Sequence, residues 1–243
     1  MFEAHFEVFF ADTAAARKIH YQIRYEVYCE ERGFEDSTAF SEKEEIDSFD
    51  KRAVHFIVRD IESKHWVAAM RLVLPGGSLP IASLCKLDNE FSTDFINGEF
   101  AEISRLCIKR EAFCFDHAEE THEEKKEGIL ERRSLGKRRV ATEIIFRFIY
   151  AAYDYSNQNG ISYWYFLATP ALGRMVSMAK IPFSPAGPAC NHNGIRIPYF
   201  ADIEHSHGFA SDNSRQIQKI IDSAKAPYTL FSDCFVNDIP LPN

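Results

Sequence analysis

The order of the predicted strands and helices constrains the fold of this chain most strongly. Three strand-like segments follow one another in the middle of the sequence, at residues 53–60, 66–74 and 100–109, without a helix between them. A doubly wound parallel sheet needs a crossover helix between neighbouring strands, so this order disfavours it. We therefore expect one α/β domain over residues 1–243, built on a mixed, twisted sheet with helices on both faces.

The segments around these three strands complete the predicted order. The residues between 116 and 135 are charged and lack apolar periodicity, so we expect a mobile insertion there. The other predicted elements are a strand at 5–10, a helix from Asp12 or Thr13 to about 31, a long helix ending at Asn159-Gly160, a strand at 161–167, a helix from Thr169-Pro170 to 179, a strand at 194–200 and a helix at 214–224.

Charge and cysteine usage exclude several classes of protein. The formal charge is −8, with 28 basic and 36 acidic residues, which argues against a nucleic-acid partner. No stretch approaches ~20 apolar residues, so we expect no transmembrane segment, and the first residues lack the basic region of a signal peptide. The six cysteines are widely spaced with no Cys-x-x-Cys, which predicts reduced thiols in a cytoplasmic protein.

Charged residues inside an apolar strand are the first candidates for a functional site. Glu102-Ile103-Ser104-Arg105 lies in the third central strand, where a carboxylate or a guanidinium costs desolvation energy unless it is paired or faces a cavity. Strict alternation would place Glu102 and Arg105 on opposite faces of the sheet. Either a β-bulge brings the two side chains together, or they serve two different surfaces.

Two other groups could contribute to such a site. Arg24 and Tyr28 are four residues apart on one face of the first helix. The acidic loop at 44–50, which contains Asp47 and Asp50, could bind an ammonium group, pair with Arg24, or simply be solvated. No His or Cys spacing supports a metal site, and we expect none.

A run of basic residues stands at the start of the long helix. The free N–H groups and the positive dipole of a helix N-terminus favour phosphate there, although a solvated charged face is the simpler interpretation. The residues are Arg132, Arg133, Lys137, Arg138 and Arg139.

Together these residues resemble one family. In order and spacing, the chain is similar to the autoinducer (acyl-homoserine-lactone) synthases, a branch of the GNAT acyltransferase fold. It departs from them at Tyr28, where they usually have Phe, and at Phe34, where they usually have Trp. Residues 196–202 look instead like the long-chain N-acyl amino acid synthases and the acyltransferases of the PEP-CTERM/exosortase system. The motifs are Arg24-x-x-x-Tyr28, Gly33-Phe34, Asp47-x-x-Asp50, Arg71-Leu72 and Glu102-x-Ser104-Arg105.

The resemblance implies an activity and a set of roles. It implies a sheet whose central strands splay apart to admit acyl-phosphopantetheine, and an N-acyltransferase that moves a long fatty acyl group from acyl carrier protein, or from acyl-CoA, to the amine of an amino acid. No cofactor is permanently bound. The alternatives are an autoinducer synthase that uses S-adenosylmethionine and a non-catalytic module that binds acyl groups or carrier protein.

The same resemblance assigns the residues. Glu102, with Ser104 beside it, is implied as the catalytic group that receives the amine proton. The basic run of the long helix is implied as the docking site for carrier protein and its phosphopantetheine. The implied acceptor pocket consists of Arg24, Tyr28, Phe34, Asp47, Asp50, Arg71 and Arg105.

Overall fold

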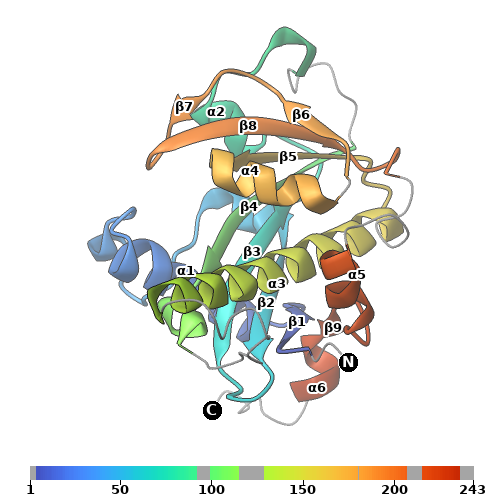
Figure 1. Cartoon of the computed structure of the whole chain (residues 1–243). Coiled ribbons are helices and arrows are strands. Elements are labelled where there is room, and N and C mark those ends of the chain that lie inside the picture. Colours follow the sequence, from blue (N-terminus) through green and yellow to red (C-terminus); the bar gives the residue numbers. More distant parts are fainter. Residues whose placement is uncertain (1–3, 92–98, 115–128, 180, 207–214, 236–243) are drawn as a thin grey trace.

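The computed structural model describes residues 4–91, 99–114, 129–179, 181–206 and 215–235 (Figure 1). None of the helices in these ranges is long and apolar enough to cross a membrane. The strands are β1 (Phe6–Phe10), β2 (Ala53–Asp60), β3 (Trp66–Val73), β4 (Phe100–Ile108), β5 (Tyr163–Ala168), β6 (Phe183–Pro185), β7 (Cys190–Asn191), β8 (Ile195–Asp202) and β9 (Thr229–Leu230). The α-helices are α1 (Ala14–Tyr25), α2 (Pro80–Leu84), α3 (Ile129–Gln158), α4 (Pro170–Val176), α5 (Arg215–Asp222) and α6 (Phe231–Phe235).

The strands form one mixed sheet, which confirms the predicted fold class. Within the described residues their order is β6-β8-β5-β4-β3-β2-β1-β9, and β7 pairs with β8 outside this path. The three consecutive strands β2, β3 and β4 are antiparallel neighbours, as an order without intervening helices requires. The β4–β5 pair is parallel, and α3 supplies its crossover.

The sheet splays between β4 and β5. Their parallel pairing joins Phe100–Ile103 to Tyr163–Phe166 and then stops, although β4 continues to Ile108. The second half of β4 therefore leaves β5, and this opening sits in the middle of the sheet rather than at an edge. The structure thus confirms the predicted divergence of these two strands.

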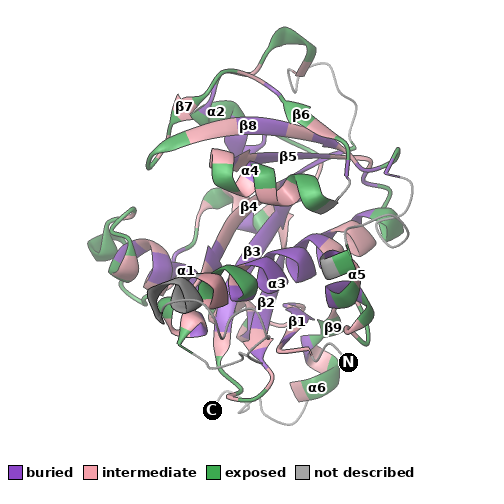
Figure 2. Ribbon diagram, in the orientation of Figure 1, coloured by how far each residue is buried: buried purple, intermediate pink, exposed green. Residues whose placement is uncertain are grey.

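Helices cover both faces of the sheet. On one face, Ile23 of α1 packs with Ile57 and Ala69, and Ile81 of α2 packs with Val73. On the other face, a larger cluster joins α3, α4 and α5 to the sheet, and α3 runs across it as a mostly buried helix (Figure 2). Buried residues from α3 in this cluster are Ile144, Ile145, Phe148, Ile149 and Ala152.

The first helix follows its predicted limits but changes its winding. Thr13 is the cap, and its hydroxyl accepts a hydrogen bond of 3.1 Å from the amide of Ala16. After Tyr25 the helix continues as a π-helical turn over Glu26–Glu31 and ends before Gly33, which has φ +63°. A π-turn is common at functional sites, and this one carries Tyr28.

Some elements differ from the sequence predictions. The long helix begins at Ile129, inside the segment that was expected to be an insertion, and the rest of that segment, 116–128, lies outside the described residues. The short elements α2, β6, β7, β9 and α6 have no counterpart in the prediction, because two to five residues are too few to show a period.

Candidate functional site

The splay opens into a cavity of about 700 Å³ that has a polar part and an apolar part. Its polar part lies on the face of the sheet covered by α1 and α2, where Glu102 and Ser104 are the register partners of Val73 and Arg71. The side chains of the polar part include Tyr28, Phe34, Asp47, Arg71, Glu102, Ser104, Arg105, His192 and Arg196. The apolar part reaches the α3 face and is lined by Ile145, Ile149, Trp164, Phe166, Leu172, Val176, Ile181 and Phe183.

Glu102 lies on β4 where the paired and the splayed halves of the strand meet. The side chain is only 1% exposed, and its Oε2 accepts a hydrogen bond of 2.8 Å from the amide of Ile81 at the start of α2. Among the described residues, no cation lies within ion-pair distance of this carboxylate. Burial raises the pKa of Glu102 to about 8, against the opposing effects of the Ile81 hydrogen bond and of the charges on Arg71 and Arg105.

A β-bulge in β4 decides where Arg105 points. Between the pairs Ala69–Cys107 and Arg71–Ser104, β4 has one more residue than β3, and Arg105 adopts a positive φ of 52°. The bulge interrupts the alternation of the strand, so Glu102, Ser104 and Arg105 line the same cavity. Of the two alternatives left open by the sequence, the structure therefore shows the bulge.

The Asp47-x-x-Asp50 spacing has a local structural cause. Asp47 caps a short helical turn over Ser48–Arg52, and its carboxylate accepts a hydrogen bond of 2.8 Å from the amide of Phe49. Asp50 reaches back and accepts one of 2.8 Å from the amide of Asp47. This reciprocal capping fixes both carboxylates beside the cavity.

Arg71 and Arg24 form ion pairs with these two carboxylates. Arg71 Nη1 lies 2.6 Å from Asp47 Oδ1 and 2.9 Å from Asp50 Oδ1, and its Nε donates a hydrogen bond of 3.1 Å to Ser104 Oγ. Arg24 Nη1 donates to Asp50 at 2.7 Å. Burial alone would raise the pKa of Asp50, but its hydrogen bonds and the two guanidinium charges hold that pKa far below its usual range.

The structure also brings in a carboxylate that the site prediction missed. Glu45 is 1% exposed and pairs with Arg24 on one side and with Arg105 Nη2, at 3.1 Å, on the other. Arg105 Nη2 lies 3.3 Å from Asp47 as well. The only sequence signal for Glu45 was its place in the acidic loop. Arg24 and Asp50 lie behind the cavity wall, so they shape the pocket through Glu45, Asp47 and Arg71.

Tyr28 and Phe34 form part of the aromatic wall of the polar part. The Tyr28 hydroxyl donates a hydrogen bond of 3.3 Å to the carbonyl of Leu106, next to the bulge, and the Arg105 guanidinium lies 5.5 Å from the centre of its ring. Burial raises the pKa of Tyr28, so the phenol stays protonated as a donor. Phe34 is 38% exposed and stands at the rim of the cavity.

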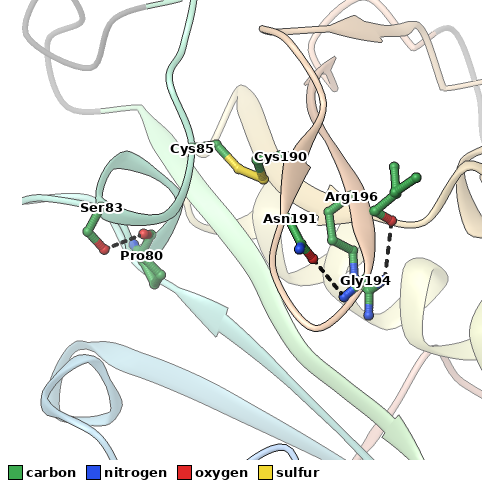
Figure 3. The surroundings of a disulfide bond; sticks show 8 residues. Pro80, Ser83, Cys85, Cys190, Asn191, Gly194 and Arg196 are labelled. Carbon is green, nitrogen blue, oxygen red and sulfur yellow. Dashed lines mark hydrogen bonds between the residues drawn. A yellow bond between two sulfur atoms is a disulfide. The ribbon is translucent and has the colours of Figure 1, made fainter.

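A disulfide joins two walls of the polar part (Figure 3). Cys85 follows α2, and Cys190 begins the β7–β8 hairpin, which supplies His192 and Arg196 to the cavity. The expectation that all cysteines are reduced is therefore wrong for this pair. The two residues are 105 positions apart, so only the tertiary fold could reveal the pairing. Among the described residues, Cys29, Cys107, Cys114 and Cys234 are free thiols.

The described part of the basic run does not line the cavity. Lys137, Arg138 and Arg139 are exposed on α3, beyond its first turn, so they do not coincide with the free N–H groups of the helix start. The side chains of Arg132 and Arg133 lie outside the described residues. The part of the chain that the structure describes also holds no group of three or more His, Cys, Asp and Glu side chains that could bind a metal ion.

This arrangement suits the transfer of an apolar group to a polar acceptor. A buried carboxylate with a raised pKa is a suitable proton acceptor near neutral pH, and it faces a chamber lined with fixed charges. The apolar part of the same cavity provides space for a hydrocarbon chain. The bulge and the end of strand pairing leave backbone groups of β4 beside the junction of the two parts.

Comparisons with known proteins agree with this geometry. Residues 23–112 match the acetyltransferase (GNAT) domain family, whereas no curated protein matches the chain. Among solved structures, the AHL synthase LasI aligns with a TM-score of 0.56 at 15% identity, over 82% of this chain and 91% of that one. BjaI, a CoA-dependent acyl-homoserine lactone synthase solved with SAM and isopentyl-CoA, aligns with a TM-score of 0.57 at 15% identity, over 93% of each chain.

The family match includes most of the polar wall. Residues 23–112 carry Tyr28, Asp47, Arg71, Glu102 and Arg105, so the match and the cavity concern the same part of the chain. The likeness to LasI and BjaI extends over 82% and 93% of this chain and shows the shared fold. Residues 23–112 thus match the GNAT acetyltransferase domain family, and the chain shares the fold of the acyl-homoserine lactone synthases LasI and BjaI.

Proposed function

We propose that this protein is an N-acyltransferase that moves a long-chain fatty acyl group from the thioester of acyl carrier protein to the amine of an amino acid. The observation that carries the proposal is the position of Glu102. A carboxylate with a pKa raised to about 8 stands at the splay, where the polar and apolar parts of one cavity meet. A thioester there would have its acyl chain in the apolar part and its carbonyl facing the polar part.

The reaction needs a base, an oriented carbonyl and a site for negative charge. The neutral acceptor amine, formed when the ammonium group releases a proton to water, forms a bond to the thioester carbon while a second proton passes from the nitrogen to Glu102. The tetrahedral oxyanion then collapses, the carbon–sulfur bond breaks, and the thiolate leaves and takes up a proton. A peptide α-amine has a pKa of roughly 8 and the amine of a free amino acid a higher one, so a carboxylate with a pKa of about 8 can accept the proton at a cost of only a few kcal/mol. Backbone N–H groups beside the bulge are the proposed oxyanion donors, and Ser104 holds Arg71 in place.

The acceptor chamber favours a free amino acid. Asp47 is a quarter exposed on its side chain and fixed by Arg71, so it can receive an ammonium group as the acceptor enters. Tyr28, Phe34 and Phe49 provide flat apolar surfaces of a size suited to an aromatic side chain. S-adenosylmethionine, the acceptor of the second candidate function, adds a sulfonium and an adenosine. That candidate is supported by the fold shared with the acyl-homoserine lactone synthases.

Acyl carrier protein is the proposed donor because its acidic surface fits an exposed basic run on α3. The chain as a whole carries a charge of −8, so local positive charge is needed to attract an acidic partner. Lys137, Arg138 and Arg139 are exposed there, and Arg132 and Arg133 precede them in the same helix. Acyl-CoA is the alternative donor. A carrier protein donor also implies action in the cytoplasm.

The test is a competition between acceptors. The purified protein receives hexadecanoyl-acyl carrier protein, or hexadecanoyl-CoA, with an equimolar mixture of the twenty amino acids and S-adenosylmethionine. Mass spectrometry identifies the product. An N-acyl amino acid supports the proposal and names the acceptor, whereas an acyl-homoserine lactone would establish the second candidate instead.

A variant separates catalysis from binding. Glu102→Gln keeps the shape of the side chain and loses its basicity, so we expect turnover to fall by roughly 10² or more. Glu62→Gln, an exposed carboxylate in the β2–β3 turn, serves as the control. Wild-type turnover in Glu102→Gln would exclude Glu102 as the base, and an absence of turnover in all proteins would favour a non-catalytic binding module.

A further inference from the structure

The arginines on the cavity wall differ in what they bind. Arg71 and Arg105 are each held by carboxylates of the protein, within 3.5 Å. Arg196 lines the same cavity and is half-buried, and within the described residues its guanidinium donates a hydrogen bond only to the carbonyl of the adjacent Ile195, at 3.3 Å. No carboxylate of the described chain lies within ion-pair distance of it. A half-buried guanidinium in a cavity is expected to have an anionic partner, and the part of the chain that the structure describes provides none.

The backbone around Arg196 is held in a defined place. Arg196 is the register partner of Cys190, whose disulfide to Cys85 anchors the hairpin beside α2 (Figure 3). The turn is closed by Gly194, with φ +100°, whose amide donates to Asn191 Oδ1 at 3.3 Å. The amide that donates to Glu102 also belongs to α2. The same short helix therefore positions both the hairpin and the proposed base.

The charges of the polar part indicate which anion fits. The carboxylates of Asp47 and Glu35 line it beside the arginines, so a phosphate with two negative charges would be less favoured there than an anion with one. A molecule with one carboxylate and one amine would instead match both signs of charge. His192 lies near both guanidiniums. Burial and the positive charges of Arg105 and Arg196 lower the pKa of His192, so its imidazole is in the neutral form.

We propose that Arg196 binds the carboxylate of the acceptor while the acceptor's amine faces Asp47 and Glu102. The inference rests on the proposed function and extends it. It assigns to the β7–β8 hairpin the selection of α-amino acids over amines that lack a carboxylate. A guanidinium binds a carboxylate through two parallel hydrogen bonds, which fixes the direction of the adjacent amine as well as the affinity.

The experiment compares each acceptor with its decarboxylated amine. The full-length protein is assayed with tyrosine and tyramine, with leucine and 3-methylbutylamine, and with S-adenosylmethionine and its decarboxylated form. For Arg196→Met, we expect the ratio of kcat/KM for the acid to kcat/KM for the amine to fall about 10- to 100-fold. Arg196→Lys should lose less. Arg174→Met removes an exposed cation of α4 outside the cavity and should leave the ratio unchanged.

The outcomes separate this inference from the proposed function. Activity on the decarboxylated amine, together with an unchanged melting temperature, shows that the Arg196 variant is folded. An unchanged ratio in an active Arg196→Met variant would overturn the inference and leave the proposed function intact. A rise in KM for the thioester alone would also overturn it, by assigning Arg196 to the phosphates of the donor. If only the S-adenosylmethionine pair reacts, the proposed acceptor is wrong while the ratio still tests Arg196. If the wild type acylates no acceptor, both proposals fail.

Discussion

Replacing Glu102 with glutamine should stabilise the folded protein, and the gain should grow with pH. Glu102 is 1% exposed, and burial raises its pKa from 4.5 to about 8. The folded state therefore holds this proton more tightly than the unfolded chain. Its contribution to stability is fully present below about pH 4.5 and is lost as the pH rises through about 8. Glutamine has the same shape and never ionises.

The size of the effect follows from the two pKa values. One pKa unit corresponds to about 1.4 kcal/mol of differential free energy. Between about pH 5 and pH 8 the wild type should lose on the order of 3 kcal/mol relative to Glu102→Gln. Most of this loss falls below the pH at which the folded carboxyl itself ionises, because over that range only the unfolded chain releases the proton.

The assay is urea unfolding of both proteins across this pH range. Every other titrating group is common to the two chains, so the difference between their free energies of unfolding isolates position 102. Glu62→Gln, with its exposed side chain, is the matched control and should track the wild type. Far-ultraviolet circular dichroism at each pH checks that the folded state is unchanged.

One result would refute the reasoning. If the difference between Glu102→Gln and the wild type stays constant from about pH 5 to pH 8, the carboxyl has no raised pKa in the folded protein. The case for Glu102 as a base with a pKa near neutral pH would then fail as well. A difference that grows with pH, together with a loss of turnover, would show that the folded protein retains a destabilising residue because the reaction needs it.

The remaining predictions concern the donor, the hairpin and the acyl chain. Replacing Arg138 and Arg139 with Glu should raise the KM for acyl carrier protein, most strongly at low salt, and an unchanged KM would mean that these residues form only a solvated surface. Reducing the Cys85–Cys190 bond, or replacing both residues with Ser, should lower the free energy of unfolding by about 2–4 kcal/mol; urea unfolding with and without dithiothreitol measures this, and equal stabilities would contradict it. Ile149→Phe should narrow the apolar part and lower kcat/KM for hexadecanoyl relative to octanoyl donors by about tenfold; equal losses for both donors would place the acyl chain elsewhere.

Local sequence patterns determined much of the fold and the types of residue at the site. The segments 53–60, 66–74 and 100–109 form the consecutive antiparallel strands that their order predicts. Glu102 and Arg105 stood out because charges are costly inside an apolar strand, and both line the cavity. Such features can be read from the sequence because strand alternation, helical spacing and desolvation depend on neighbouring residues.

Only the tertiary structure decided how these parts combine. The pairing of Glu45 with Arg24, the bulge at Arg105, and the bond from Cys85 to Cys190 all join segments whose distance is set by the path of the whole chain. The hairpin that places Arg196 on the cavity wall depends on β7, a strand of two residues that is too short to show a period. A sequence shows which residues are charged but not which of them form ion pairs with each other. Here, folding engaged Arg71 and Arg105 with carboxylates and left Arg196 without one among the described residues, because a contact energy depends on separation in space rather than along the chain.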